Sequence, residues 1–278
     1  MRHHYRVSLA RTTLIVAAVA AAGALAARPA KGQNPDTLAA RLKAQAADTT
    51  DKIDPDAMDA LNKMGAYLRS LKAFQVTAEV TDEEVLPDGQ KLQFGSLAEL
   101  IAEKPNHLRV DLNSDRKHRV FFFDGKTFTL YAPRPRFYAT VDAPATIAEM
   151  ANQLESKYGI DLPFVDLFRW GTPESGAEDI KDAADIGASQ VDGVTCEHFA
   201  FRQAGLDWEI WIQQGDFPLP RKIVLTTLTD DARPQHVSRY TWNLAPSMNA
   251  ATFAFAPTKD DKKITLAELR APTTAAKK

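Results

Sequence analysis

The chain has 278 residues, with 34 lysines and arginines against 36 aspartates and glutamates. Residues 1–26 hold three of the arginines and no acid, so the chain that follows them carries a net charge of about −5. Because nucleic-acid binding needs a basic surface, this balance argues against a nucleic-acid partner. The length suits one large β domain or two small ones, and it is enough to bury a sizeable core.

Residues 1–26 have the pattern of a secretory signal peptide. Arg2, Arg6 and Arg11 form a basic start, residues 14–22 are apolar without a break, and residues 23–26 supply the small side chains read by signal peptidase. We predict cleavage after Ala26 and a periplasmic protein. The apolar run is shorter than a membrane span, and no later stretch reaches about 20 apolar residues, so the protein is not expected to span a membrane.

A flexible lead over residues 27–52 is expected before an amphipathic helix. Asp54-Pro55-Asp56 supplies an N-cap and a proline at the first helical position. Apolar side chains then recur at helical spacing over residues 56–71.

From Phe74 the apolar period changes to two, which is typical of half-buried strands. Tight turns such as Asp124-Gly125 and Asp192-Gly193 favour antiparallel hairpins. A helical insert at residues 144–170 separates two runs of strands, and residues 257–278 are expected to form a mobile tail. The pattern predicts one α+β, mainly antiparallel β domain over residues 53–256, with strands at 74–80, 91–103, 107–113, 117–123, 126–131, 137–141, 194–202, 206–213, 222–229 and 236–243.

Several short motifs resemble a bacterial family of predicted periplasmic proteins, domain of unknown function 2092. The resemblance extends from about residue 53 to residue 255. The motifs are YLRSL at 67–71, KPN at 104–106, FDGKT at 123–127, YGIDLP at 158–163, DWEIWI at 207–212 and PLPRK at 218–222.

That family in turn is similar in fold to the lipoprotein-carrier superfamily of LolA, LolB and RseB. The resemblance implies a curved half-barrel sheet wrapped on an N-terminal helix, with a central helical plug. It also implies a non-enzymatic role, in which the sheet holds an acyl chain, a lipid or a lipidated protein. Arg109 and Arg119 lie on predicted strands, but no motif marks either as the strand arginine that closes the plug in LolA.

The sequence has no motif for catalysis, a metal or a cofactor. His107, His118, His198 and His236 are scattered without metal-ligand spacing. Cys196 is the single cysteine, so no internal disulfide forms. It lies about 7 Å from His198 along one strand face, too far for a catalytic pair, and we interpret it as a core residue.

Aromatic and aliphatic residues are abundant on the predicted sheet and insert. A packed core is one interpretation, and an apolar cavity that holds a ligand is the other. An envelope sensor or scaffold that binds a protein partner, and a hydrolase with carboxylates or a histidine at the mouth of the sheet, remain alternatives. The cavity hypothesis predicts an apolar floor of Phe74, Val76, Leu108, Val110, Phe122, Leu130, Trp208 and Ile210, and a lid of Ile147, Met150, Leu154, Leu162, Phe164, Phe168 and Trp170.

Overall fold

The structure, a computed structural model, describes residues 52–269. The predicted signal peptide, its cleavage after Ala26 and the predicted lead up to residue 51 lie outside the described residues. Within residues 52–269, no helix is both long enough and apolar enough to cross a membrane.

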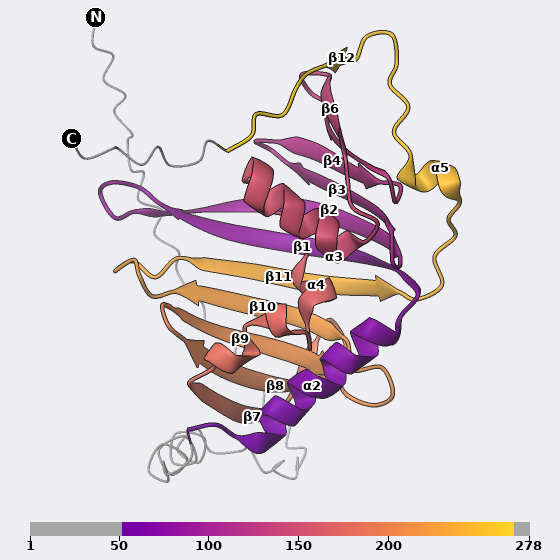
Figure 1. The fold of residues 1–278 in the computed structure, drawn as a ribbon. Coiled ribbons are helices and arrows are strands. Elements are labelled where there is room, and N and C mark those ends of the chain that lie inside the picture. The colour runs from indigo at the N-terminus through magenta and orange to yellow at the C-terminus, as the bar shows by residue number, and fades with distance from the viewer. Residues whose placement is uncertain (1–51, 270–278) are drawn as a thin grey trace, which may run out of the picture. The chain divides into compact units, whose positions relative to one another are not determined.

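Twelve strands form one open, curved sheet (Figure 1). The strand order is β12-β6-β5-β4-β3-β2-β1-β11-β10-β9-β8-β7, and every neighbouring pair is antiparallel except β12 with β6. The predicted mainly antiparallel β class is therefore confirmed. The strands are β1 (Ala73–Val85), β2 (Lys91–Glu103), β3 (His107–Ser114), β4 (His118–Phe123), β5 (Thr127–Ala132), β6 (Phe137–Asp142), β7 (Asp182–Val191), β8 (Val194–Gln203), β9 (Leu206–Gln213), β10 (Pro220–Thr227), β11 (Gln235–Asn243) and β12 (Lys262–Lys263).

Pairing of β1 with β11 joins the two runs of strands into one sheet. The register extends from Gln75 opposite Asn243 to Asp82 opposite His236. The first strand of one run therefore lies beside the last long strand of the other, and side chains more than 150 residues apart in sequence become direct neighbours.

The helices are short apart from the first. Asp54 caps that helix as the sequence predicts, since its Oδ1 accepts a hydrogen bond from the backbone N–H of Asp56 at 2.9 Å. The helical segments are α2 (Pro55–Ser70), α3 (Ile147–Gln153), the π-helical turn η1 (Leu154–Tyr158), α4 (Asp166–Arg169), the 3-10 turns η2 (Pro173–Ser175) and η3 (Ala177–Asp179), and α5 (Ala250–Phe253).

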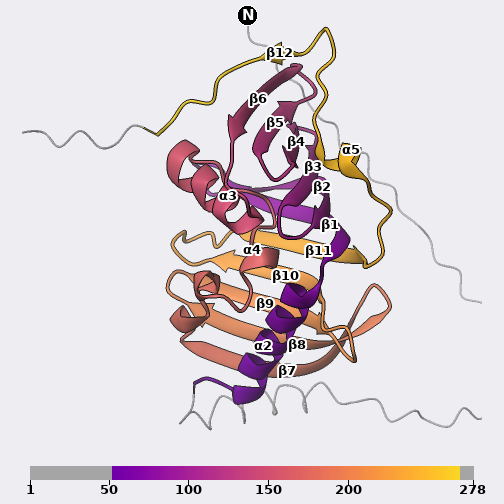
Figure 2. The same cartoon turned by 45° about the vertical axis from the view of Figure 1, so that its right-hand side comes forward.

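One face of the sheet, which we call the inner face, carries α2, α3 and α4 (Figure 1). In both views α2 crosses the part formed by β7 to β10, and α3 lies over the part formed by β1 to β3 (Figure 1, Figure 2). Leu61 and Met64 of α2 belong to one cluster of buried side chains with Ile210, and Met150 of α3 belongs to another with Val110. Leu71 and Trp242 touch both groups of buried side chains, so the two groups form adjoining parts of one core.

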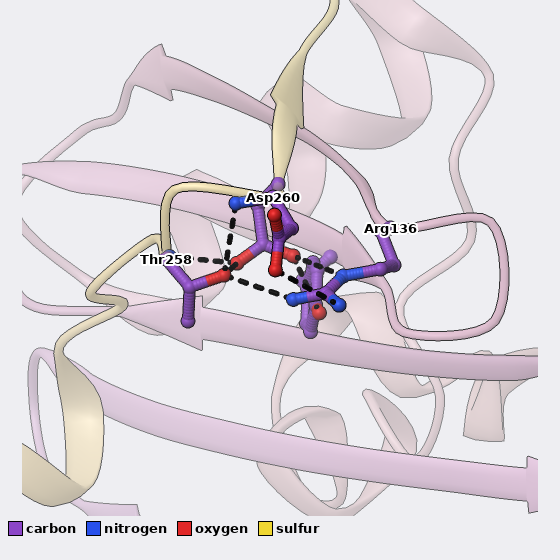
Figure 3. A network of polar contacts seen from close by, with 5 residues as sticks. Arg136, Thr258 and Asp260 are labelled. Carbon is purple, nitrogen blue, oxygen red and sulfur yellow. Dashed lines mark hydrogen bonds and ion pairs between the residues drawn. The ribbon is translucent and has the colours of Figure 1, made fainter.

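Residues 257–269, part of the segment expected to form a mobile tail, contact the sheet through side-chain hydrogen bonds and ion pairs. The Asp261 carboxylate accepts hydrogen bonds from the backbone N–H and the hydroxyl of Thr258, both at 2.7 Å, and from the Tyr131 hydroxyl at 2.9 Å. These hydrogen bonds, with the one to Thr258 the largest influence, lower the pKa of Asp261 to about 2. Arg136 forms ion pairs with Asp260 at 3.5 Å and with Asp261 at 3.4 Å. Figure 3 shows Arg136 beside Thr258 and Asp260. The two aspartates therefore have partners on β5 and beside β6, more than 100 residues away in sequence.

Candidate functional site

A cavity of about 740 Å³, which we call the large cavity, lies against the inner face of the sheet. One side is formed by residues of β9, β10 and β11 and by the neighbouring parts of β1, β2 and β3. The other side is formed by residues 161–180, which belong to the connection between β6 and β7. The cavity therefore separates this connection from the sheet. Its apolar lining includes Val80, Leu112, Phe164, Leu167, Trp170, Ile180, Leu206, Trp208, Ile223, Leu225 and Tyr240.

The sheet side of the large cavity changes from apolar to polar across neighbouring strands. Trp208 on β9 lies opposite Leu225 on β10, Leu225 lies opposite His236 on β11, and His236 lies opposite Asp82 on β1. All four residues line the cavity. A ligand lying along this row would meet carbon surface at the β9 end and hydrogen-bonding groups at the β1 end.

The polar end contains a hydrogen-bonded chain of three side chains. His236 Nδ1 lies 2.6 Å from Asp82 Oδ1, and His236 Nε2 lies 2.8 Å from Ser238 Oγ. The hydrogen bond to His236 lowers the pKa of Asp82. This is the connectivity of the side chains in serine hydrolases.

Two features of this chain argue against hydrolysis. Ser238 has no exposed surface, so a substrate cannot touch its hydroxyl in this conformation. β11 is hydrogen-bonded on both sides, to β1 and to β10. The backbone N–H groups around Ser238 therefore donate to neighbouring strands and do not form an oxyanion hole. We interpret Asp82, His236 and Ser238 as a polar brace between β1 and β11.

The segment that covers the large cavity is bounded by two residues with left-handed backbone. Phe164, before α4, has φ +61°, and Gly171, after α4, has φ +72°. The left-handed region costs a residue with a Cβ about 1–2 kcal/mol, so contacts must hold Phe164 in place. Its ring packs edge-on against Tyr240, with 6.2 Å between the ring centroids. The left-handed backbone at residue 171 favours glycine, and a Cβ there would lie 1.7 Å from Nη1 of Arg69, so the Arg69 guanidinium would also have to move.

Two tryptophans and the carboxylate of Asp166 also line the large cavity. Trp170 packs against Trp208 at 5.6 Å between ring centroids, and both indole N–H groups are buried without a hydrogen-bond partner. Asp166 has exposed surface, but it also lines the cavity and is surrounded by protein. Desolvation raises its pKa, opposed by the positive charges of Arg169 and His236. Burial also raises the pKa of Tyr240, to about 12.

Residues 57–267 match the model of a family described as predicted periplasmic protein, DUF2092. The chain belongs to this family. The resemblance inferred from the sequence motifs is therefore confirmed over residues 57–267.

The solved structures most similar to this DUF2092 protein include three bacterial proteins. LprF from Mycobacterium bovis is 13% identical, with 70% of this chain and 96% of that chain covered and a TM-score of 0.44. Lipoprotein LppX from Mycobacterium tuberculosis is 9% identical, with 70% and 100% covered and a TM-score of 0.36. A LolA superfamily protein from Nitrosomonas europaea is 10% identical, with 72% and 97% covered and a TM-score of 0.32. A search of curated proteins finds no match to the chain.

Seven of the eight predicted floor residues lie on the inner face, but only Trp208 lines the large cavity. Ile210 is buried against residues of α2. The others belong to the core packed against α3 and α4, where they are covered by protein rather than open to a ligand. They are Phe74, Val76, Leu108, Val110 and, half-buried at its edge, Leu130.

The prediction for Phe122 is wrong, because this side chain points to the outer face. Phe122 lies opposite Arg109, whose guanidinium carbon is 5.5 Å from the ring centroid, and Phe255 lies at 5.5 Å between ring centroids. Its neighbours Phe121 and Phe123 are the residues buried on the inner face. In a run of three phenylalanines the alternation gives no phase, so the sequence could not assign the faces.

The predicted lid residues divide into three groups. Phe164 and Trp170 line the large cavity. Ile147 and Phe168 line a second pocket on the other side of α4. Met150, Leu154 and Leu162 are buried in the core with residues of the sheet.

Sequence reasoning missed the polar lining of the large cavity. His236 was one of four histidines without metal-ligand spacing, and no local pattern singles out Asp82. Only the pairing of β1 with β11 brings these two residues together. The predicted floor also left out Ile223, Leu225 and Tyr240, although the apolar alternation on β10 and β11 is a signal that could have identified them.

Cys196 is buried, as the sequence analysis expects. It belongs to a small apolar cluster with Val191, Trp211 and Val224. Burial raises the pKa of its thiol, so the unreactive protonated form is favoured. Among the described residues, no group of three histidine, cysteine or acidic side chains could hold a metal ion.

Proposed function

We propose that this protein binds an apolar ligand, such as an acyl chain, in the large cavity, and that it carries the ligand in the periplasm without changing it chemically. The observation that carries the proposal is the cavity itself. Its volume of about 740 Å³ falls within the range of roughly 300–1,000 Å³ typical of small-molecule sites. Its lining is mainly apolar, which suits a hydrocarbon chain better than a polar metabolite.

The hydrophobic effect sets the expected dependence on chain length. Each methylene group moved from water into an apolar site contributes about 0.8 kcal/mol. This corresponds to a change of about fourfold in Kd per added carbon, since about 1.4 kcal/mol equals a factor of ten. Affinity should rise at this rate until the chain fills the cavity, and then level off.

The segment from Phe164 to Gly171 is the proposed lid. Its central helix α4 has only four residues. Its two ends have the left-handed backbone already described. Rotation about these two positions would lift α4 and open the large cavity without breaking the hydrogen bonds of the sheet.

The surface features support a carrier over a scaffold. A scaffold without a cavity would need an exposed apolar patch for its partner. The largest exposed apolar side chains of the described residues are spread over different elements. They are Ile53, Leu97, Phe137, Ile186, Phe217, Ile264 and Leu269.

Native mass spectrometry of the protein purified from its own bacterial envelope tests the proposal. A bound lipid or acylated peptide, released on denaturation, is the expected result. Ala177→Phe, which places a large ring into the large cavity, should reduce the bound fraction. Ala188→Phe, at an exposed position of β7, is the matched control and should leave it unchanged. A clean unliganded mass, together with no uptake of a fluorescent fatty acid, would overturn the proposal.

A further inference from the structure

A second pocket of about 560 Å³ lies on the other side of α4 from the large cavity. It is formed where the end of α2, the residues after β2, the start of α3 and α4 meet. Three cationic residues line it, and no aspartate or glutamate does. We call it the cationic pocket, and its lining residues are Leu68, Arg69, Ser70, Leu71, Lys72, Lys104, Pro105, Thr146, Ile147, Ala148, Leu167 and Phe168.

Two of the three cations are held in place by backbone carbonyl groups. Nη1 of Arg69 donates a hydrogen bond to the Trp170 carbonyl at 2.8 Å. Nζ of Lys104 donates to the carbonyls of Leu68, at 2.9 Å, and Arg69, at 2.7 Å. Neither these two cations nor Lys72 forms an ion pair with a carboxylate anywhere in residues 52–269.

Three positive charges kept together without a counter-charge favour an anion. Desolvation, and then the nearby charge of Arg69, lower the pKa of Lys104, so the charged form of this ammonium group is destabilised in the pocket. A carboxylate or phosphate would relieve the repulsion and accept charge-assisted hydrogen bonds. The large cavity offers no equivalent, because its charged lining is mixed, with Asp82, Asp161 and Asp166 facing Lys117, Arg169 and His236.

Apart from Ser70 and Thr146, the rest of the cationic pocket is apolar, and the pocket adjoins the large cavity. Leu71 and Phe168 form part of its surface, and Leu167 lines both spaces. The α4 helix is therefore the wall between them. A chain that starts beside the cations can reach the large cavity by displacing Leu167.

We propose that the cationic pocket binds the anionic head group, a carboxylate or a phosphate, of an amphiphile whose hydrocarbon chain occupies the large cavity. This inference rests on the proposed function, because it assumes that the large cavity holds the chain. It adds the chemical class of the ligand and the residues that select it.

Calorimetric titration of the full chain with probes of one chain length tests the inference. The probes are dodecanoate, dodecyl phosphate, dodecanol and dodecyltrimethylammonium, with acetate and inorganic phosphate as head groups alone. The two anionic amphiphiles should bind at least about tenfold more tightly than dodecanol, since a charge-assisted hydrogen bond is worth that factor or more. Their advantage should shrink in high salt, which screens partly exposed charges.

Lys72→Gln is the most informative variant, because the Lys72 side chain is exposed and its loss leaves the fold contacts of Arg69 and Lys104 in place. It should weaken the anionic probes by about tenfold and leave dodecanol unchanged. Lys126→Gln, an exposed lysine in the β4–β5 turn, is the control and should change neither.

The outcomes separate the two claims. Equal binding of all four amphiphiles, or no effect of Lys72→Gln on the anionic ones, would overturn the anionic head group and leave the carrier function standing. Inorganic phosphate binding as tightly as dodecyl phosphate would show a simple anion site and would also overturn the inference. Failure of every amphiphile to bind would overturn the proposed function itself.

Discussion

Replacing Phe164 by aspartate should impair ligand binding far more than folding. The Phe164 side chain is half-buried, lines the large cavity and packs edge-on against Tyr240. Half the value of a fully buried phenylalanine is about 0.75–1.5 kcal/mol, and the ring pair adds about 0.5–1.5 kcal/mol. The left-handed backbone at residue 164 costs about 1–2 kcal/mol. Aspartate adopts this backbone more easily than phenylalanine, so the substitution recovers part of that cost. The net loss of unfolding free energy should therefore be about 1–2 kcal/mol.

Binding should suffer more, because the new carboxylate would enter an apolar lining that already contains Asp161 and Asp166. An apolar chain in the cavity would have to desolvate this charge. We expect the Kd of a fluorescent fatty acid to rise at least about tenfold, which corresponds to about 1.4 kcal/mol.

Two further variants separate the loss of the ring from the added charge, and the cavity lining from the buried core. Phe164→Asn removes the ring without adding charge, so it should fold as well as Phe164→Asp and bind better. Leu154→Asp alters the same connection in the core, where the leucine is 1% exposed, and should cost more than about 4 kcal/mol by cavity formation and charge burial. Urea unfolding followed by circular dichroism gives the stabilities. Phe164→Asp losing as much stability as Leu154→Asp, or keeping the wild-type affinity, would refute the reasoning.

Three further predictions concern titration and the polar brace. The pKa of Asp261 is about 2 in the folded protein, below its ordinary value. The ionised carboxylate therefore stabilises the fold above pH 4, and this contribution is lost as the pH falls towards 2. Asp261→Asn should cause the same loss at neutral pH, measured as faster tryptic cleavage at Lys262 and Lys263. The pKa of Asp166 is raised, so stability should fall as the pH rises through that pKa; Asp166→Asn should be more stable than wild type at pH 7 in urea unfolding, and a less stable variant would contradict this. A fluorophosphonate probe should leave Ser238 unlabelled, and labelling that disappears in Ser238→Ala would show a catalytic serine instead of a brace.

The fold class was accessible from the sequence because its signals are local. Alternation of apolar residues identified the strands, and Asp54-Pro55-Asp56 identified the start of α2. The hairpin turns needed only their own residues, such as Asp124-Gly125. Contacts between distant segments left no such signal, as Asp261 shows, since its partner Tyr131 lies 130 residues away.

The site was predictable only in its apolar part. Phe164, Trp170 and Trp208 were identified from hydrophobic spacing, and all three line the large cavity. Phe74 and Val110 have the same spacing, yet they are buried core, because hydrophobic pattern cannot distinguish a filled interior from an open one. The cationic pocket forms where the end of α2 packs beside Lys104 and α4. These segments are far apart in sequence, so no local pattern predicts that they lie together.

Quenching of tryptophan fluorescence by a brominated chain tests the central claim most directly. The chain has four tryptophans. Trp170 and Trp208 line the large cavity, whereas Trp211 stacks on His198 away from it and the Trp242 indole donates a hydrogen bond to the Pro220 carbonyl. Dodecanol brominated near its methyl end should quench the wild-type protein saturably, and the variant with both Trp170→Phe and Trp208→Phe should lose that quenching. No saturable quenching of the wild type, or equal quenching of the double variant, would show that the chain does not occupy the space beneath α4.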